Sequence, residues 1–337
     1  MKSHRILSAL LSAVLCCGLL TACGGGTATQ SAASSTSGTQ AAEQSIVCTI
    51  FPEYDWIRAI LGEEQESFDL TMLLDSGTDL HSYQPTAEDM MIISNCDLIV
   101  YVGGESDQWV EDALKNTANP NQKVIKLLDV LGSSIKEEEV KEGMEAEEEE
   151  EGDDKEDGPE YDEHVWLSLR NAQTLTKALC DAIKELDPNH ADQYQANCNS
   201  YCQELSALDA DYQRAVDSAA VKTVLFGDRF PFRYLVDDYG LDYYAAFVGC
   251  SAETEASFET VVFLASKVDE LNLHSVFTIE KSDQKIAQTI IDNTSAKNQT
   301  ILSLDSMQST TARDMEQGAT YRSIMEQNLE TLKQGLT

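Results

Sequence analysis

The chain has 337 residues, in which Asp and Glu outnumber Lys and Arg by 59 to 23, and its formal net charge is -36. This charge excludes nucleic acid as a partner, because binding phosphate groups requires a basic surface. The length is too great for one comfortable hydrophobic core and predicts two domains of ordinary size.

The first residues have the pattern of a bacterial export signal. Lys2 and Arg5 precede an apolar stretch that is too short to span a membrane comfortably, and the stretch ends in the lipobox-like sequence Leu-Thr-Ala-Cys at Cys23. We predict a signal peptide at residues 1–22, lipidation of Cys23, and a flexible tether rich in Gly, Ser and Thr at residues 23–44. The protein is then anchored by lipid on the extracellular or periplasmic face of the cell membrane. An ordinary secretory signal with an incidental cysteine is the alternative.

Short apolar runs alternate with helical patterns from residue 45 onward, which is typical of parallel sheets covered by helices. A stripe of apolar residues at helical spacing also runs between Tyr194 and Tyr212. Together these patterns predict an α/β fold of two lobes, joined by one long helix and separated by a ligand cleft. The predicted lobes are residues 45–170 and 220–337, with linking helices over residues 171–219. The predicted strands are residues 46–50, 68–74, 98–102, 123–127, 221–226, 275–279 and 300–304.

An acidic segment interrupts the first predicted lobe. Residues 136–163 are nearly all Glu, Asp, Lys and Gly. Such a block repels itself and buries nothing, so we predict that it is a disordered surface loop. The alternative is a specific cation-binding cage, but acidic runs usually bind cations weakly.

Six cysteines follow the predicted lipid-bearing one. Outside the membrane, an even number of thiols permits disulfides. None of these cysteines has CxxC spacing, which disfavours a tetrathiolate zinc site, and several lie in apolar surroundings typical of a core. Their pairing cannot be read from the sequence. They are Cys48, Cys96, Cys180, Cys198, Cys202 and Cys250.

Four side chains that can bind a metal lie at the ends of predicted segments. His81 follows the second predicted strand across a turn-rich segment, and His164 ends the acidic segment. Asp228 and Asp305 follow two predicted strands of the second lobe. Because the carboxyl ends of parallel strands share one edge of a sheet, loops after several strands converge on one crevice. The pattern therefore predicts a metal site formed by His81, His164, Asp228 and Asp305.

Three groups of residues carry a resemblance to a known family. One surrounds His81, one surrounds His164, and one lies in the second lobe. Together they resemble the zinc- and manganese-binding solute-binding proteins of ABC transporters, over nearly all of the chain that follows the tether. The matching residues are 75–85, 96–104 and Trp109; 163–167, 187–188, Tyr194 and Asn197; and Tyr234, 239–241, Glu280, Tyr321, Met325, Asn328 and Leu332.

The resemblance implies two lobes connected by one rigid backbone helix, here the helix around Leu205, with a metal held between the lobes by ligands from both. His81 and His164 carry over directly as ligands. Asp305 fits the aspartate that follows a C-terminal strand in the family. Glu280 is one of the family's C-terminal landmarks and is expected beside the ligands.

One position departs from the family pattern. Arg229 stands where the family usually has His or Glu, and a guanidinium cannot bind a cation. We therefore predict the neighbouring Asp228 as the ligand. The alternative is that Arg229 holds the carboxylate of an anionic ligand.

Two imidazoles with two carboxylates suit zinc, manganese or iron(II), and the general order of metal affinities favours zinc. The expected function is capture of Zn²⁺, with Mn²⁺ or Fe²⁺ as alternatives, by a monomer that delivers it to an ABC permease in the membrane. A surface adhesin and a binder of an organic or chelated ligand are the other hypotheses. We expect no enzymatic activity, because the sequence has neither a His-Glu-x-x-His element nor a Gly-x-Ser-x-Gly turn.

Overall fold

A computed structural model gives the structure of the protein and describes residues 44–145, 160–251 and 255–337. The predicted signal peptide, Cys23 and nearly all of the tether lie outside these residues, as does the middle of the acidic segment. Among the described residues, no helix combines the length and the apolar character that crossing a bilayer requires.

Two sheets of four parallel strands form the framework of the described chain, with the strand orders β2-β1-β3-β4 and β6-β5-β7-β8. This arrangement confirms the predicted fold class. The strands of the first sheet are β1 (Gln44–Cys48), β2 (Phe68–Met72), β3 (Leu98–Tyr101) and β4 (Lys123–Lys126). Those of the second sheet are β5 (Thr223–Phe230), β6 (Asp242–Val248), β7 (Ser275–Ile279) and β8 (Thr300–Leu304).

Helices join the strands and cover the sheets. The first half contains α1 (Phe51–Leu61), α2 (Ala87–Asn95), α3 (Gln108–Leu114) and α4 (Leu127–Leu131), with short 3₁₀ turns η1 (Gly62–Ser67), η2 (Leu80–Ser82), η3 (Gly132–Ser134) and η4 (Val165–Leu167). The connection contains α5 (Leu169–Leu186), η5 (Pro188–His190) and α6 (Ala191–Ser218). The second half contains α7 (Arg233–Tyr239), α8 (Phe258–Leu271), α9 (Lys285–Asn293), α10 (Ala312–Glu316) and α11 (Tyr321–Gly335).

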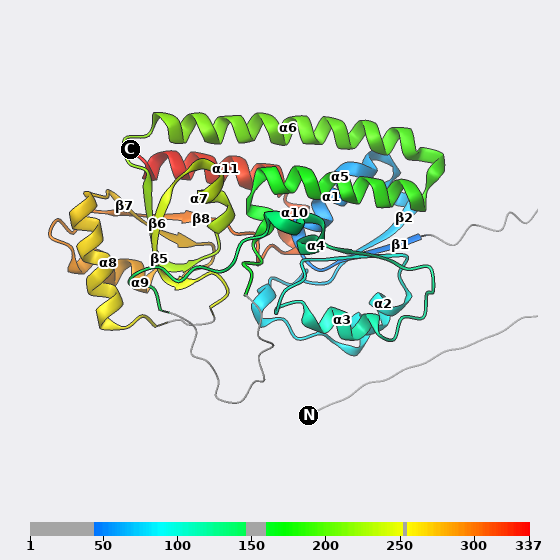
Figure 1. Ribbon diagram of the computed structural model, residues 1–337, viewed down its shortest axis with the longest axis horizontal. Coiled ribbons are helices and arrows are strands. Elements are labelled where there is room, and N and C mark those ends of the chain that lie inside the picture. Colours follow the sequence, from blue (N-terminus) through cyan, green and yellow to red (C-terminus); the bar gives the residue numbers. More distant parts are fainter. Residues whose placement is uncertain (1–43, 146–159, 252–254) are drawn as a thin grey trace, which may run out of the picture. The chain divides into compact units, whose positions relative to one another are not determined.

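The long connecting helix is the 28-residue α6, which runs alongside α5 and α11 (Figure 1). The predicted apolar stripe is buried at Tyr194, Leu205 and Tyr212, whereas Tyr201 within it is half-buried. Asp187 and Pro188 separate α6 from α5, as their order predicts, because proline tolerates the first turn of a helix but not its interior.

Two details of the second sheet differ from the sequence-based prediction. Strand β5 does not end at Phe226 but continues to Phe230, with a shift in its pairing with β6 between Phe226 and Arg229. Gly227 and Asp228 have the composition of a turn, yet the bulge keeps them in the strand while Phe230 is buried. Asp228 therefore lies within β5, not after it. Strand β6 itself was not predicted.

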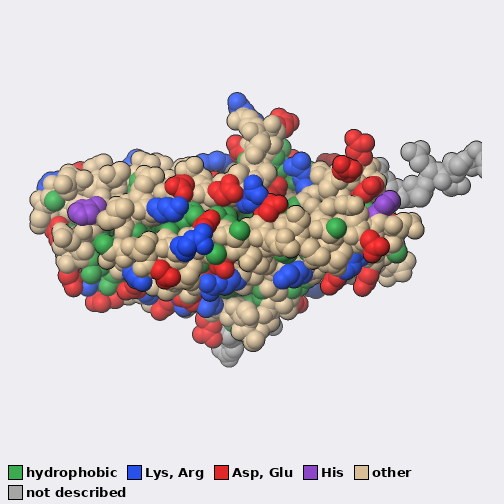
Figure 2. Space-filling view, turned by 90° about the horizontal axis from the view of Figure 1, so that it is seen from above, with side chains coloured by type: hydrophobic (Ala, Val, Ile, Leu, Met, Phe, Trp, Pro, Cys, Tyr) green, Lys and Arg blue, Asp and Glu red, His purple; other side chains and the backbone are tan. Residues whose placement is uncertain are grey.

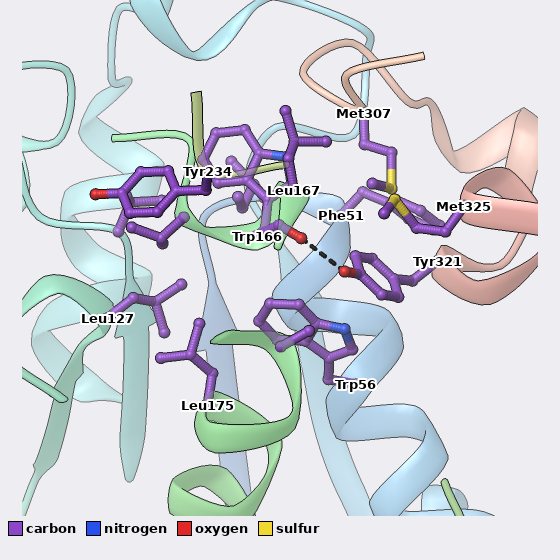
Figure 3. Packing of buried hydrophobic residues seen from close by; sticks show 14 of the residues in the cluster. Phe51, Trp56, Leu127, Trp166, Leu167, Leu175, Tyr234, Met307, Tyr321 and Met325 are labelled. Carbon is purple, nitrogen blue, oxygen red and sulfur yellow. Dashed lines mark hydrogen bonds between the residues drawn. The ribbon is translucent and has the colours of Figure 1, made fainter. Parts of the chain in front are cut away.

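One hydrophobic core includes residues of both sheets. Trp166 of η4 and Tyr321 of α11 are fully buried in it, and the Tyr321 hydroxyl donates a 2.6 Å hydrogen bond to the Trp166 carbonyl (Figure 3). The backbone N–H of Tyr321 also donates to a carboxylate oxygen of Asp55 in α1, at 2.8 Å. The C-terminal helix therefore packs on the first half of the chain, which holds the two sheets together.

The acidic segment is packed at both of its described ends, residues 136–145 and 160–163. Glu137 forms an antiparallel bridge with Tyr161, and Glu145 forms a parallel bridge with Phe247 in β6. The prediction of a disordered loop over residues 136–163 is therefore wrong for these ends, because backbone pairing holds charged residues that bury little apolar surface. Residues 146–159 lie outside the described part.

On the face over α6 shown in Figure 2, acidic and basic side chains are interspersed.

Five of the six cysteines are buried free thiols, which agrees with the expectation that several belong to the core. They are Cys48, Cys96, Cys180, Cys198 and Cys202.

Candidate metal centre

His81 is placed by the short turn η2, which follows β2. Asp79 caps this turn, and its carboxylate accepts a 3.1 Å hydrogen bond from the backbone N–H of His81. The His81 side chain is only 6% exposed, and its Nδ1 lies 2.6 Å from the Ser106 hydroxyl and 3.9 Å from a Glu163 carboxylate oxygen. Burial holds the pKa of His81 well below its usual range, and the positive charges of His164 and Arg229 lower it further.

His164 immediately precedes η4 and is completely buried. One carboxylate oxygen of Asp162 accepts from the His164 backbone N–H at 2.9 Å and lies 3.0 Å from its Nδ1. Burial acts to lower the pKa of His164, but the negative charge and hydrogen bond of Asp162 outweigh it, so the pKa lies above its usual value.

The two imidazoles face each other, with their Nε2 atoms 3.1 Å apart. Each Nδ1 has an oxygen neighbour, Ser106 for His81 and Asp162 for His164. Oxygen partners of this kind keep the proton on Nδ1 in metal-binding histidines, which leaves the Nε2 lone pair for the metal. The structure thus brings together the two histidines that the sequence singled out, and adds the partners Ser106 and Asp162, which it did not.

Cys250 completes a group of three potential ligands. One ligand atom each from His81, His164 and Cys250 lies within 4.8 Å of the other two. Cys250 is half-buried and stands just after β6. Sequence reasoning missed its position because β6 was not predicted, although the apolar run between Gly240 and Gly249 is a usable strand signal.

Gly249 lets the end of β6 lie close to the His164 ring. A Cβ atom built on Gly249 would lie 2.9 Å from Cε1 of His164 and 3.0 Å from the carbonyl oxygen of Phe230. Contacts below 3 Å are repulsive, so any side chain here would push the end of β6 away from His164.

Asp228 and Arg229 do not belong to this group of three. Asp228 accepts backbone hydrogen bonds on both carboxylate oxygens, from Arg229 at 2.9 Å and from Ile279 at 3.3 Å. The Arg229 guanidinium pairs with Asp79, the residue that caps the turn carrying His81. Its Nη1 also lies 3.5 Å from the Ser251 carbonyl. Arg229 therefore already has a carboxylate partner within the chain.

Asp305 and Glu280 lie together at the ends of β8 and β7 and are also outside the group of three. Asp305 accepts a 2.8 Å hydrogen bond from the backbone of Met307. Burial, with a further contribution from the charge of Glu280, raises the pKa of Asp305 to about 7. Glu280 accepts from the backbone N–H of Ser306 at 2.7 Å and from its hydroxyl at 2.9 Å. Glu280 thus supports the loop that follows Asp305.

Comparison with known proteins shows the family to which the chain belongs. Residues 46–335 match the family described as "ZnuA: Zinc-uptake complex component A periplasmic". The chain belongs to this family. It is 28% identical over 327 residues to the high-affinity zinc uptake system protein ZnuA of Bacillus subtilis, covering 97% of each chain. It is 29% identical over 291 residues to the zinc-binding lipoprotein AdcA of Streptococcus pneumoniae serotype 4, covering 86% of this chain but only 55% of that one.

The fold of this chain is also similar to that of a solved structure. The Zn(II)-bound ZnuA-like domain of AdcA from Streptococcus pneumoniae superposes with a TM-score of 0.67 at 26% identity, covering 87% of this chain and 99% of that one. The chain spans about half the length of several curated relatives that it matches, all of them AdcA proteins.

Proposed function

We propose that the chain is the metal-capturing component of a zinc uptake system and hands Zn²⁺ to a permease in the membrane. The convergence of the His81 and His164 Nε2 atoms, each backed by an oxygen at Nδ1, is the observation that carries this proposal. The names of the relatives, which include a zinc uptake protein and zinc-binding lipoproteins, support it. In this role the protein binds and releases an ion and is not an enzyme.

The proposed site lies between elements of both sheets. His81 and His164 are the proposed ligands from the first half of the chain. Asp305, at the end of β8, remains a predicted carboxylate ligand, and Asp228 remains a prediction that its two backbone hydrogen bonds disfavour. A site with two imidazoles favours zinc over manganese, following the general order of affinities.

The proposed location follows from the same role. A lipid on Cys23 would hold the protein at the outer face of the membrane, beside the permease that receives the ion. The lipoprotein name of the AdcA relative supports this placement.

Titration of chelator-treated protein tests the proposal. In competition with a chromophoric chelator, the chain should bind one zinc ion, and manganese should displace zinc only in large excess. The permease step is tested by growth in zinc-depleted medium, which should require the intact chain. Absence of stoichiometric zinc binding contradicts the proposal.

Gly249→Ala should weaken zinc binding about tenfold, which is about 1.4 kcal/mol. The added methyl group meets His164, and relieving the clash moves either the imidazole or the end of β6. Gly240→Ala is the control, because it strains a left-handed residue with no atom within 4 Å and so lowers stability without touching the site. Equal zinc affinities for the two variants would show that Gly249 has no role in shaping the site.

A further inference from the structure

Two nitrogen atoms and one sulfur atom already have nearly the spacing of a zinc site. With Zn–N bonds of about 2.0–2.1 Å and a Zn–S bond of about 2.3 Å, the ligand atoms of a tetrahedral zinc lie roughly 3.3–3.6 Å apart. In this chain the two Nε2 atoms are 3.1 Å apart, and Cys250 contributes a sulfur to a group that fits within 4.8 Å. Movements of about 1 Å or less would let all three reach one ion.

The fold holds Cys250 in this place through its neighbours. Gly249 brings the end of β6 against the His164 ring, as described above. Arg229 pairs with β6 at Phe247, and its guanidinium reaches both the Ser251 carbonyl and Asp79. The same arginine thus connects the loop that carries Cys250 to the turn that carries His81.

Arg229 cannot itself bind a cation. The carboxylate beside it, Asp228, accepts backbone hydrogen bonds from Arg229 and Ile279 and lies outside the group of three. Among the described residues that follow or belong to strands of the second sheet, Cys250 is the one that joins His81 and His164 in this group.

We propose that Cys250 is the third metal ligand and binds zinc as a thiolate together with His81 and His164. The inference rests on the proposed function and deepens it. On binding, the S–H bond breaks, its proton passes to solvent, and a Zn–S bond replaces a bond from zinc to water, with no change of oxidation state. A thiolate is a soft ligand that suits zinc and disfavours manganese, so Cys250 sets the selectivity of the site.

X-ray absorption at the zinc edge of the zinc-loaded full chain is the direct test, because it needs no variant. We expect one sulfur at about 2.3 Å from zinc in addition to lighter ligand atoms. Cys250→Ser should lose this sulfur. Cys202→Ala, which removes a thiol buried between α5 and α6, should keep it.

Affinity gives a second, independent readout. Cys250→Ser should weaken zinc binding at least about 100-fold, since even removing an outer partner of a ligand costs 10–100-fold. It should weaken manganese binding much less, so the ratio of zinc to manganese affinity falls. The near-ultraviolet charge-transfer band of the cobalt(II)-loaded chain, which reports a thiolate bond, should disappear in the same variant.

The outcomes separate this inference from the proposed function. If zinc has only nitrogen and oxygen neighbours in the intact chain, while zinc binding still requires the two histidines, the Cys250 assignment is overturned and the proposed function stands. If zinc binding survives loss of both histidines, the shared site is overturned and the assignment of Cys250 falls with it.

Discussion

Replacing both His81 and His164 by alanine should remove zinc binding and the stabilisation that zinc gives to the folded chain. A ligand that binds only the native state stabilises it by about 4.1 kcal/mol when its concentration is 1,000 times Kd. For a chain of this size, that corresponds to a rise in melting temperature on the order of 10 °C. Thermal unfolding of the intact chain with and without zinc should show this rise, and the double variant should show none.

The other described histidines provide a matched control. His190 pairs with Asp187 at the start of α6, and His274 is exposed before β7, so neither belongs to the group of three. His190→Ala with His274→Ala removes the same number of imidazoles and should leave the zinc-induced rise intact. An equal loss in the two double variants would mean that the chain binds zinc without a defined site at His81 and His164.

The fold class was predictable because the alternation of short apolar runs with helical stripes determines a parallel α/β arrangement almost regardless of detail. Strand β6 carries a mixed signal. Its Tyr, Phe and Val residues favour a strand, but Ala245 and Ala246 in its middle and Asp242 at its start do not. Its strand conformation comes from pairing with β5, which is a tertiary effect.

The candidate site was predictable only in part. His81 and His164 stand out locally, because each lies next to a strand or turn signal. The position of Cys250 depends on the path of β6 and on Gly249, so spacing along the chain gave no reason to choose it among six thiols. Asp228 was misplaced because Gly227 and Asp228 look like a turn, whereas the pairing of β5 absorbs them as a bulge.

A buried carboxyl group away from the ligands contributes to the pH dependence of the metal-free fold. Glu53 lies at the start of α1, where one of its oxygens accepts hydrogen bonds from the backbone N–H groups of Thr49 at 2.9 Å and Ile50 at 3.2 Å. Its other oxygen is buried and has no hydrogen-bond partner among the described residues. Burial, helped by the negative charge of Asp107, raises the pKa of Glu53 to about 8.

The Glu53→Gln variant should therefore gain folding stability relative to the unchanged chain as the pH rises from 5 to 9. Between the unfolded pKa, about 4.3, and the folded pKa the native state holds a proton that the unfolded state has lost, so the native Glu53 loses stability as pH rises through this window. Glutamine resembles the protonated acid at every pH, and the difference in unfolding free energy should change by roughly 3–5 kcal/mol across the window. Urea unfolding of chelator-treated protein at several pH values measures this difference. Glu63→Gln, at an exposed position, is the control. A difference that stays constant with pH would mean that Glu53 is ionised in the folded chain.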